Sequence, residues 1–332
     1  MLSKKVKKYI SKRKIMLAMW NCESQHDPYT KSRWYLPFKD IAKDVILFDT
    51  NMNRKKYGEQ KMNKMLLQKI DIEKPNIIVF LPIVEELDPA CLVTIRQDYP
   101  KIKTICVFGV DSWRYESYSK RHAIFFDYIV TILSKEGYEK HKKAGHKVFL
   151  SHSGVNTEEY RPLNLEKIYD VGFIGGASYN RVQQINYLLK YGIDVHVWGR
   201  GWKRKLIKEE NYHGPLDTDK WSETVCQTKI NLNFSLNGDG EYQVKGRPWE
   251  LGACKGFVIS DNCQEYLDYF SENEIVLFNT KDELLVSIYY YLENEKERNK
   301  IANEMYKKIL KKYSLSEELN KIMEKIMKDS KK

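Results

Sequence analysis

Short apolar runs alternate with helical stretches through the first half of the chain. The runs predict buried strands at Ile15–Trp20, Val45–Asp49, Asn76–Leu81, Thr104–Phe108, Tyr128–Thr131 and Lys147–Ser151. Continuous apolar character is typical of parallel strands that are covered on both faces. Between the strands, the patterns of Glu59–Ile70 and Lys135–Ala144 predict helices. This alternation predicts a doubly wound parallel sheet with right-handed crossovers.

A segment rich in Gly, Asn and Pro, Gly154–Asn164, interrupts the pattern, and a second series follows it. The strands of this series are predicted at Tyr169–Ile174, Asp194–Trp198, Lys229–Phe234, Phe257–Ser260 and Ile275–Phe278. Three helices close the chain, and capping boxes begin the first of them at Thr280 and the last at Ser314.

We therefore expect an α/β protein of two doubly wound, Rossmann-like domains that face a central cleft. The N-terminal domain would comprise residues 1–158 and the C-terminal domain residues 159–312. A final helix, residues 313–332, would pack back toward the N-terminal domain. In open α/β sheets, ligands bind outside the carboxyl ends of the strands. The candidate site residues are therefore those that end or follow the predicted strands.

The stretch Gly246–Asp261 predicts a short helix that leads into a buried strand. Pro248 suits a first helical turn, and Gly256 suits a left-handed helix end. Lys245 and Arg247 crowd the start of this helix, although a helix N-terminus already carries about half a positive charge. A bound anion such as a phosphate would explain two cations at this position.

Glu250 lies three residues after Arg247, on the same face of the predicted helix. A carboxylate beside a phosphate site is suited to accept hydrogen bonds from sugar hydroxyls. An anion together with hydroxyls suggests a nucleotide or a nucleotide-sugar. The alternative is an ordinary surface ion pair between the two side chains, which contributes little.

The second series opens with YDVGFIGGASYNR, residues 169–181. Gly175 and Gly176 form the turn after the strand, and Asn180 is the expected N-cap of the helix that follows. Two glycines at such a turn let backbone N–H groups approach a diphosphate closely, and Arg181 would reach the same anion. A plain tight turn is the alternative.

Two further candidates follow or end strands of the C-terminal domain. Gly199 and Arg200 come directly after the strand that ends at Trp198. They are expected to form part of a base or phosphate pocket, and a simple exit turn is the alternative. Asn233 alternates with apolar residues near the end of its strand, and it contacts a ligand or satisfies loop backbone.

In the N-terminal domain, Asp111, Trp113 and Arg114 follow the strand that ends at Phe108. An acid, an aromatic platform and a cation together suit sugar recognition, whereas an Asp helix cap beside a structural Trp is the alternative. His152 follows the last predicted strand of this domain and is a candidate catalytic residue. A structural role is the more common one for a lone histidine.

Composition restricts the partners and the compartment. The chain of 332 residues carries a net charge of +11, and seven Lys and Arg residues fall within its first fourteen positions. Such a run suits anionic lipid headgroups or nucleic acid, although a solvated, partly frayed terminus is the more common case. No apolar run reaches the roughly 20 residues needed to span a bilayer. The six cysteines show no zinc spacing and are expected to be reduced, buried thiols in a cytoplasmic protein.

Five segments follow one another in order over Tyr169–Ser314: YDVGFIGGASYNR, VWGRGW, KINLNF, GRPWELGACKGFVISD and ELLVSIYYYLENEKERNKIANEMYKKILKKYS. Three more occur in the first half: FGVDSWRYESYS, FDYIVTILSKEGYEKHKKAG and SGVNTEEYRP. Closely in the second half and more loosely in the first, the chain resembles the group 1 GT-B glycosyltransferases, specifically the CgeB-like group named for a spore-maturation protein.

The resemblance implies a hexosyltransferase whose donor is a nucleotide-diphosphate sugar, with a UDP-sugar expected, bound mainly by the C-terminal domain. It implies a glycan, lipid-linked or protein acceptor, bound mainly by the N-terminal domain, and retention of the anomeric configuration. Neither a cofactor nor a metal is expected, because cationic side chains offset the charge of the leaving diphosphate. Glu250 matches the glutamate expected at the ribose. Many relatives carry a second glutamate eight residues earlier, where this chain has Tyr242 beside Glu241.

The site residues expected on this basis fall into three groups. The donor-binding group is Gly175, Gly176, Arg181, Gly199, Arg200, Asn233, Lys245, Arg247 and Glu250. The catalytic group is Asp111, His152 and Arg247, and the acceptor side carries Trp113 and Arg114. The alternatives are a sugar-nucleotide epimerase of the same fold and a basic module that binds nucleic acid or a membrane. For a glycosyltransferase, nucleic acid is not an expected partner, and the basic N-terminus would contact the inner face of an anionic membrane.

Overall fold

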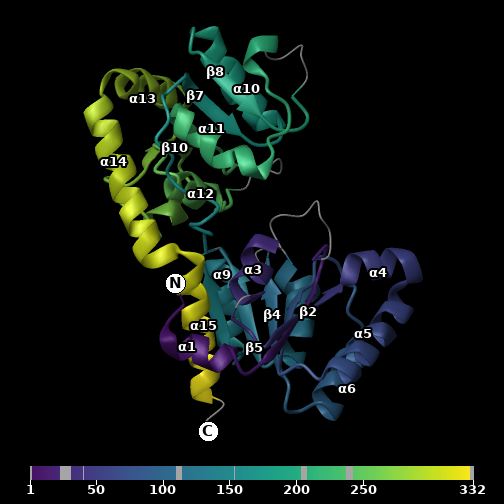
Figure 1. The fold of residues 1–332 in the computed structure, drawn as a ribbon. Helices are drawn as coiled ribbons and strands as arrows, with labels where there is room; N and C mark the ends of the chain where they lie inside the picture. The colour runs from purple at the N-terminus through teal and green to yellow at the C-terminus, as the bar shows by residue number, and fades with distance from the viewer. Residues whose placement is uncertain are drawn as a thin grey trace. The chain divides into compact units, whose positions relative to one another are not determined.

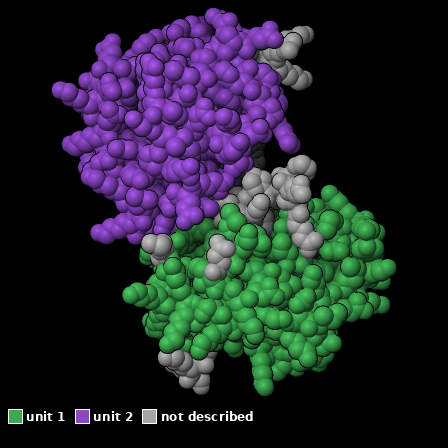
Figure 2. All heavy atoms as spheres, viewed as in Figure 1, with its two compact units in different colours: residues 1–154, 315–332 green, residues 155–314 purple. Residues whose placement is uncertain are grey.

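The computed structural model describes residues 2–22, 31–39, 41–109, 114–152, 154–202, 208–236 and 242–329. The chain forms two compact units, which Figure 2 shows in different colours. Unit 1 comprises residues 1–154 and 315–332, and unit 2 comprises residues 155–314. The sequence-based boundaries at 158 and 312 lie near the residues where the chain passes from one unit to the other.

Unit 1 is built on a parallel sheet whose described strands are the six predicted from the sequence. They are β1 (Lys14–Met19), β2 (Asp44–Asp49), β3 (Ile77–Leu81), β4 (Lys103–Phe108), β5 (Tyr128–Ile132) and β6 (Val148–Ser151). Their order in the sheet is β2-β1-β3-β4-β5-β6. In the register, Ile15 of β1 lies between Val45 of β2 and Ile77 of β3. The two neighbours of β1 therefore lie on opposite sides of it, which confirms a doubly wound sheet.

Alternate residues of these strands enter separate apolar cores on the two faces of the sheet. Ile15, Leu17 and Met19 belong to one core, whereas Met16 and Ala18 belong to the other. The first core is closed by α1 (Lys4–Ile10), α3 (Leu36–Lys39) and α15 (Leu315–Asp329). The second is closed mainly by α5 (Glu59–Glu73) and α6 (Pro89–Asp98). Coverage on both faces is the reason that these strands are apolar throughout.

The remaining elements of unit 1 connect the strands. They are η1 (Lys31–Tyr35), α4 (Thr50–Tyr57), η2 (Tyr115–Ser119), α8 (Lys120–His122), η3 (Ala123–Phe125) and α9 (Lys135–Lys143). Helix α9 begins as expected, because the Ser134 side chain accepts a hydrogen bond from the Gly137 N–H.

Unit 2 repeats the topology with a five-stranded sheet. Its described strands are β7 (Tyr169–Ile174), β8 (Val195–Trp198), β9 (Thr228–Asn233), β10 (Val258–Asp261) and β11 (Val276–Phe278), in the order β11-β10-β9-β7-β8. All pairs are parallel. Numbered within each unit, the first five strands of both sheets follow the order 2-1-3-4-5, so each unit is a Rossmann-like, doubly wound α/β fold.

The helices of unit 2 lie on both faces of its sheet (Figure 1). Helices α10 (Tyr179–Lys190), α13 (Lys281–Glu293) and α14 (Glu295–Lys308) contribute to the core that contains Val171 and Phe173. Helices α11 (Trp221–Gln227) and α12 (Arg247–Ala253) pack on β9. Short helical turns complete the unit: η4 (Glu209–Asn211), η5 (Thr218–Lys220), η6 (Gln264–Asp268) and η7 (Ile309–Tyr313).

Two local expectations for unit 2 are wrong. Helix α10 begins after Ser178, so Asn180 lies within its first turn and is not the N-cap. After α12, the left-handed residue is Lys255, with φ of 58°, and not Gly256. Gly256 is required for space instead, because a Cβ there would lie 2.7 Å from Val225 Cγ1. The stop after α10 is as expected, since Gly192 has φ of 77°.

The basic N-terminus is an ordered helix, which corrects the expectation of a frayed segment. Leu2, Val6 and Ile10 are buried in the first core of unit 1. The Ser3 N–H donates to Asn320 Oδ1 at 2.9 Å, which attaches α1 to α15, and Figure 1 shows these two helices side by side. The lysines of α1 therefore lie on a helix whose apolar face is already used by the fold.

The six cysteines are buried thiols, as expected. Among the residues that the structure describes, none of the helices combines the length and the apolar character needed to cross a bilayer.

Replacement of Ile10 by alanine tests the contribution of α1 to unit 1. Ile10 is fully buried, so Ile10→Ala should lower the free energy of unfolding by about 2–5 kcal/mol, the range for truncation of a buried isoleucine. Denaturant unfolding of wild type and variant measures this difference. Lys8→Ala, on the exposed side of the same helix, is the control and should change stability by less than about 0.5 kcal/mol. Equal stability of Ile10→Ala and wild type would show that α1 is not part of the core.

Candidate functional site

The carboxyl edge of the unit 2 sheet has its topological switch point between β7 and β9. The chain leaves β7 toward β8 on one side and returns to β9 on the other. Gly175 and Gly176 follow β7, and Phe234 follows β9. Loops at such a point diverge in opposite directions, which leaves room for a ligand between them. Most of the predicted donor-binding residues lie on these loops, on the loop after β8, or on the helices that follow.

Glycines bring the loops after β7 and β8 into contact. Gly199 has φ of 149°, and a Cβ there would lie 2.1 Å from Gly175 O, so no other residue fits without a backbone shift. The Gly175 N–H donates to Trp198 O at 2.7 Å, and the Ala177 N–H donates to Arg200 O at 2.8 Å. The Gly175 amide is thus used within the fold, and the Gly176 amide is the better candidate of the two for a ligand.

Arg181 connects the loops on the two sides of the switch point. Its Nη1 donates to Gly176 O at 2.9 Å, and its Nη2 lies 3.5 Å from Phe234 O. Its guanidinium carbon lies 5.5 Å from the centre of the Phe173 ring. The third nitrogen of the guanidinium, Nε, is buried and has no hydrogen-bond partner.

A second guanidinium lies near the first. Burial lowers the pKa of Arg181, and the positive charge of Arg247 lowers it further, while Asp261 acts in the opposite direction. Arg247 is the first residue of α12, and its guanidinium carbon lies 4.6 Å from the centre of the Trp221 ring. The two cations therefore repel each other in a partly desolvated environment.

Arg247 forms the expected contact with Glu250, but the contact leaves donors unused. Nε of Arg247 lies 3.4 Å from Glu250 Oε2, within ion-pair distance but without the alignment of a hydrogen bond. Nε1 of Trp221 is likewise buried without a partner. Buried donors normally have partners. Arg181, Arg247 and Trp221 thus each have a buried donor nitrogen without a hydrogen-bond partner.

Of two other predicted donor residues, the structure buries Asn233 in a polar network, and the backbone of the half-buried Lys245 joins the same network. Asn233 is only 2% exposed, and its Nδ2 contacts the hydroxyls of Ser260 at 2.8 Å and Tyr266 at 3.1 Å. The Lys245 N–H donates to the same Tyr266 hydroxyl, and Lys245 Nζ donates to Gln243 Oε1 at 2.7 Å. Arg200, by contrast, is exposed on the loop after β8.

In unit 1, the predicted residues Asp111 and Trp113 lie outside the described residues. The structure describes Arg114 of the predicted acceptor side and His152 of the predicted catalytic group. Arg114 Nη1 donates to Ile83 O, in the loop after β3, at 2.7 Å. Its guanidinium carbon lies 4.6 Å from the centre of the Tyr118 ring. Arg114 is therefore at the carboxyl edge of the sheet.

His152 is held by a buried carboxylate that sequence reasoning did not identify. Its Nδ1 lies 3.3 Å from Glu318 Oε1, and its N–H donates to Glu318 Oε2 at 3.1 Å. Glu318 belongs to α15, near the end of the chain, and no sequence pattern around His152 indicates that this helix packs beside it. The histidine is thus oriented by a group from the far end of the chain.

A buried acid also organises the loop that accepts the Arg114 hydrogen bond. Glu86 is fully buried and accepts from the Val84 N–H at 2.9 Å and from the Thr50 hydroxyl at 3.3 Å. Burial raises the pKa of Glu86, while these hydrogen bonds act to lower it. Through these hydrogen bonds, Glu86 fixes the conformation of the loop after β3.

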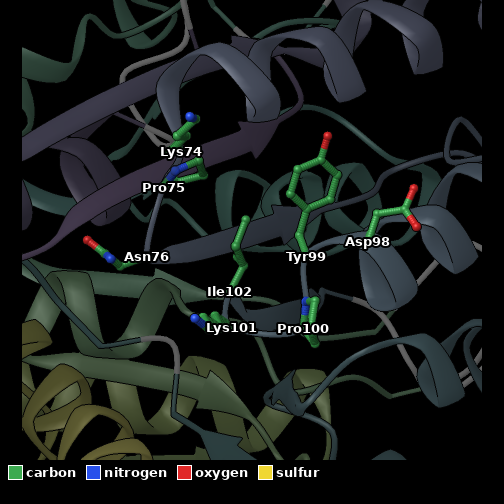
Figure 3. A pocket seen from close by; sticks show the side chains of 8 residues that line it. All are labelled: Lys74, Pro75, Asn76, Asp98, Tyr99, Pro100, Lys101 and Ile102. Carbon is green, nitrogen blue, oxygen red and sulfur yellow. The ribbon is translucent and has the colours of Figure 1, made fainter.

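The structure also contains a cavity at the opposite edge of the unit 1 sheet (Figure 3). Its volume is about 460 Å³, and its lining is Lys74, Pro75, Asn76, Asp98, Tyr99, Pro100, Lys101 and Ile102. These residues precede β3 and β4, at the amino ends of the strands. The cavity is thus on the edge away from the residues discussed above, although two lysines make it a useful comparison for any anion-binding test.

Residues 181–324 match the family model described as glycosyl transferase-like. No curated protein sequence matches the chain. Among solved structures, a glycosyltransferase from Rickettsia africae has a TM-score of 0.66 at 14% identity, with 96% of this chain and 99% of that chain covered. HepE from Anabaena in complex with UDP has a TM-score of 0.66 at 11% identity, with 95% and 100% covered. Sucrose-phosphate synthase from Thermosynechococcus elongatus has a TM-score of 0.68 at 9% identity, with 96% and 100% covered.

These likenesses show the fold. The chain consists of two Rossmann-like domains, the fold class of the GT-B glycosyltransferases, as the sequence led us to expect. The family match covers residues 181–324, which span most of unit 2 and the first part of α15.

The pH dependence of stability tests the His152–Glu318 contact. Burial acts to raise the pKa of Glu318, but the hydrogen bond and charge of His152 outweigh it, and the pKa lies below the ordinary 4.5. Near that pH the unfolded state therefore binds more protons, so the stability from Glu318 is present above 4.5 and is lost as the pH falls through its folded pKa.

Glu318→Gln should therefore be less stable than wild type near neutral pH, and the difference should shrink as the pH falls below 4.5. Denaturant midpoints measured across this range give the difference. Glu324→Gln, on the same helix, serves as the control. A difference for Glu318→Gln that does not change with pH would contradict the assignment.

Proposed function

We propose that the protein is a nucleotide-sugar-dependent glycosyltransferase, and that unit 2 binds the donor at the switch point between β7 and β9. The observation that carries this proposal is the pair of guanidinium groups, Arg181 and Arg247, with unpartnered buried Nε atoms at that point. Two cations that repel each other gain most from a ligand with multiple negative charges. A diphosphate is such a ligand, and it occupies this position in many doubly wound folds.

Related structures support a uridine nucleotide as the donor. HepE from Anabaena was solved with UDP, with UDP and glucose, and with UDP-glucose. TarM from Staphylococcus aureus was solved with UDP and α-GlcNAc-glycerol, and a phage T4 β-glucosyltransferase with UDP-glucose. We propose by analogy a UDP-sugar as donor and hexosyl transfer as the reaction.

Each residue then has a defined role at the donor. Arg181 and Arg247 would offset the charge of the diphosphate, and Lys245 and the exposed Arg200 would add to the positive field. Negative charge on the diphosphate grows as the sugar leaves, so preorganised cations stabilise the transition state more than the ground state. Glu250 would exchange its contact with Arg247 for the ribose hydroxyls. With the charge offset by side chains, we propose that donor binding requires neither a metal nor another cofactor.

We propose that the acceptor binds to unit 1 and is a glycan, lipid-linked or protein group. Arg114 and His152 lie at the carboxyl edge of that sheet, and Asp111 and Trp113, outside the described residues, belong to the same proposed set. Glu318 would keep His152 oriented for proton transfer. Membership of the CgeB-like group, retention of configuration and a cytoplasmic location complete the proposal. A sugar-nucleotide epimerase is not favoured, because the family match and the neighbours named above are with glycosyltransferases.

Binding of UDP tests the donor site. We expect isothermal calorimetry to give the same UDP affinity with EDTA as with added Mg²⁺. Arg247→Ala should weaken that affinity by about 10- to 100-fold, the factor for loss of hydrogen bonds to a charged group. Circular dichroism checks that the variant is folded.

Lys101→Ala is the matched control, because it removes a cation from the unit 1 cavity, at the amino ends of β3 and β4, and leaves the proposed donor site intact. It should leave the affinity unchanged. Weakened binding in Lys101→Ala together with wild-type binding in Arg247→Ala would place the nucleotide in that cavity instead. A strict requirement for a divalent metal would refute the metal-independent part of the proposal.

We further propose that the lysines of α1 contact an anionic membrane by charge alone, since Val6 and Ile10 are buried in unit 1. Deletion of the helix would disrupt the core, so the sharper variant replaces by Gln only the exposed Lys4, Lys5 and Lys8 of α1 and Lys12, which follows it. Each lysine near an anionic surface contributes about 1 kcal/mol. The variant should therefore bind phosphatidylglycerol vesicles at least about tenfold more weakly and show a smaller dependence on salt.

The matched control replaces four exposed lysines on α4 and α5, namely Lys55, Lys56, Lys61 and Lys64, by Gln. This control has the same net charge as the α1 variant. If both variants lose vesicle binding equally, the effect belongs to total charge and not to α1.

A further inference from the structure

Tyr266 is a buried hydroxyl that connects two segments of the proposed donor site. It belongs to η6 and is fully buried. Its oxygen accepts from the Lys245 N–H and from Asn233 Nδ2, both at 3.1 Å, and it lies 2.8 Å from Ser235 Oγ. A phenol has two acceptor positions and one proton, so donation to Ser235 completes its hydrogen-bonding capacity.

The same network is closed from the other side by Asp261, at the end of β10. Its carboxylate accepts from the Ser235 N–H at 2.7 Å and from the Leu236 N–H at 3.0 Å. Burial raises the pKa of Asp261, while these hydrogen bonds act to lower it. The backbone amides of Ser235 and Leu236 are therefore occupied by a side chain of the protein and are not available to an anion.

The segments held by this network are the ones that position those guanidinium groups. The segment Phe234–Leu236 supplies the carbonyl of Phe234 that faces Arg181 Nη2. The backbone of Lys245 leads through Gly246 directly into Arg247. The hydroxyl of Tyr266 bonds to both segments, through Ser235 on one side and Lys245 on the other.

We propose that Tyr266 is a positioning residue for the anion site, which sets the spacing of Arg181 and Arg247 without contacting the ligand. This inference rests on the proposed function of the site. Charged hydrogen bonds to a diphosphate depend on donor placement to within a few tenths of an ångström. Loss of the hydroxyl would let the Lys245 segment move relative to the loop after β9, and UDP binding would weaken although no contacting residue has changed.

Tyr313 provides a matched control for this hydroxyl. The rings of Tyr266 and Tyr313 lie 6.1 Å and 6.0 Å, respectively, from the ring of Trp249. The hydroxyl of Tyr313 donates to Tyr269 O, outside the two segments that carry the cations. Tyr266→Phe and Tyr313→Phe each remove one hydroxyl from a tyrosine that packs on the same tryptophan.

The experiment measures UDP affinity by calorimetry and the melting temperature for wild type and both variants. We expect the two variants to have similarly lowered melting temperatures. Only Tyr266→Phe should bind UDP more weakly, by about fivefold or more, the factor that corresponds to one neutral hydrogen bond. In the Arg247→Ala background, Tyr266→Phe should have a smaller effect, because the residue it positions is absent.

The outcomes separate this inference from the function on which it rests. If wild type does not bind UDP or another nucleoside diphosphate, the proposed function fails and the inference falls with it. If wild type binds UDP but Tyr266→Phe binds it equally well, or if both variants weaken binding alike, the inference alone is overturned. Should Tyr266→Phe not fold, Ser235→Ala replaces it, since it removes the acceptor of the Tyr266 proton, and the same outcomes apply.

Discussion

The arrangement of unit 2 depends on one half-buried cation, Arg181, between the loops after β7 and β9. A guanidinium in a partly desolvated position normally has a carboxylate partner. Here its described hydrogen bonds go to two backbone carbonyls, and the charges of Arg247 and Asp261 act on it in opposite directions. Carbonyl oxygens satisfy donors without cancelling charge. Arg181 therefore brings a positive charge to the point where the loops after β7 and β9 diverge.

This constraint explains the surrounding residues. Gly199 and Gly175 bring the loop after β8 close enough to support the turn after β7. The network of Asn233, Tyr266 and Asp261 fixes the loop after β9. Asp261 accepts hydrogen bonds from backbone amides of this loop, and it acts on Arg181 through its charge. Glu250 lies close enough to Arg247 to limit the repulsion in the absence of a ligand.

The sequence predicted the elements of regular structure well and the polar contacts poorly, for physical reasons. Strands such as Ile77–Leu81 are buried on both faces, so their apolar runs are visible in sequence alone. The positions of Gly175, Arg181 and Arg247 near one edge follow from the rule that parallel strands end together. Asn233 was assigned to the ligand because an isolated strand pattern cannot distinguish a polar residue that faces a site from one that faces a buried tyrosine. Glu318 could not be paired with His152, since only tertiary structure brings residues 166 positions apart into contact.

The completion of unit 1 by α15 connects the folding of both units. Leu319, Ile322 and Met323 of this helix enter the core formed by α1 and β1, and Ser3 bonds to a residue 317 positions away. Gly154 has φ of 41°, and a Cβ there would be crowded, because it would lie 3.1 Å from the backbone of Leu315. Contacts this distant in sequence form only after the entropy of closing a long loop is overcome. Unit 2 lies within that loop, so we expect its folding to shorten the effective loop and to lower the entropic cost of docking α15.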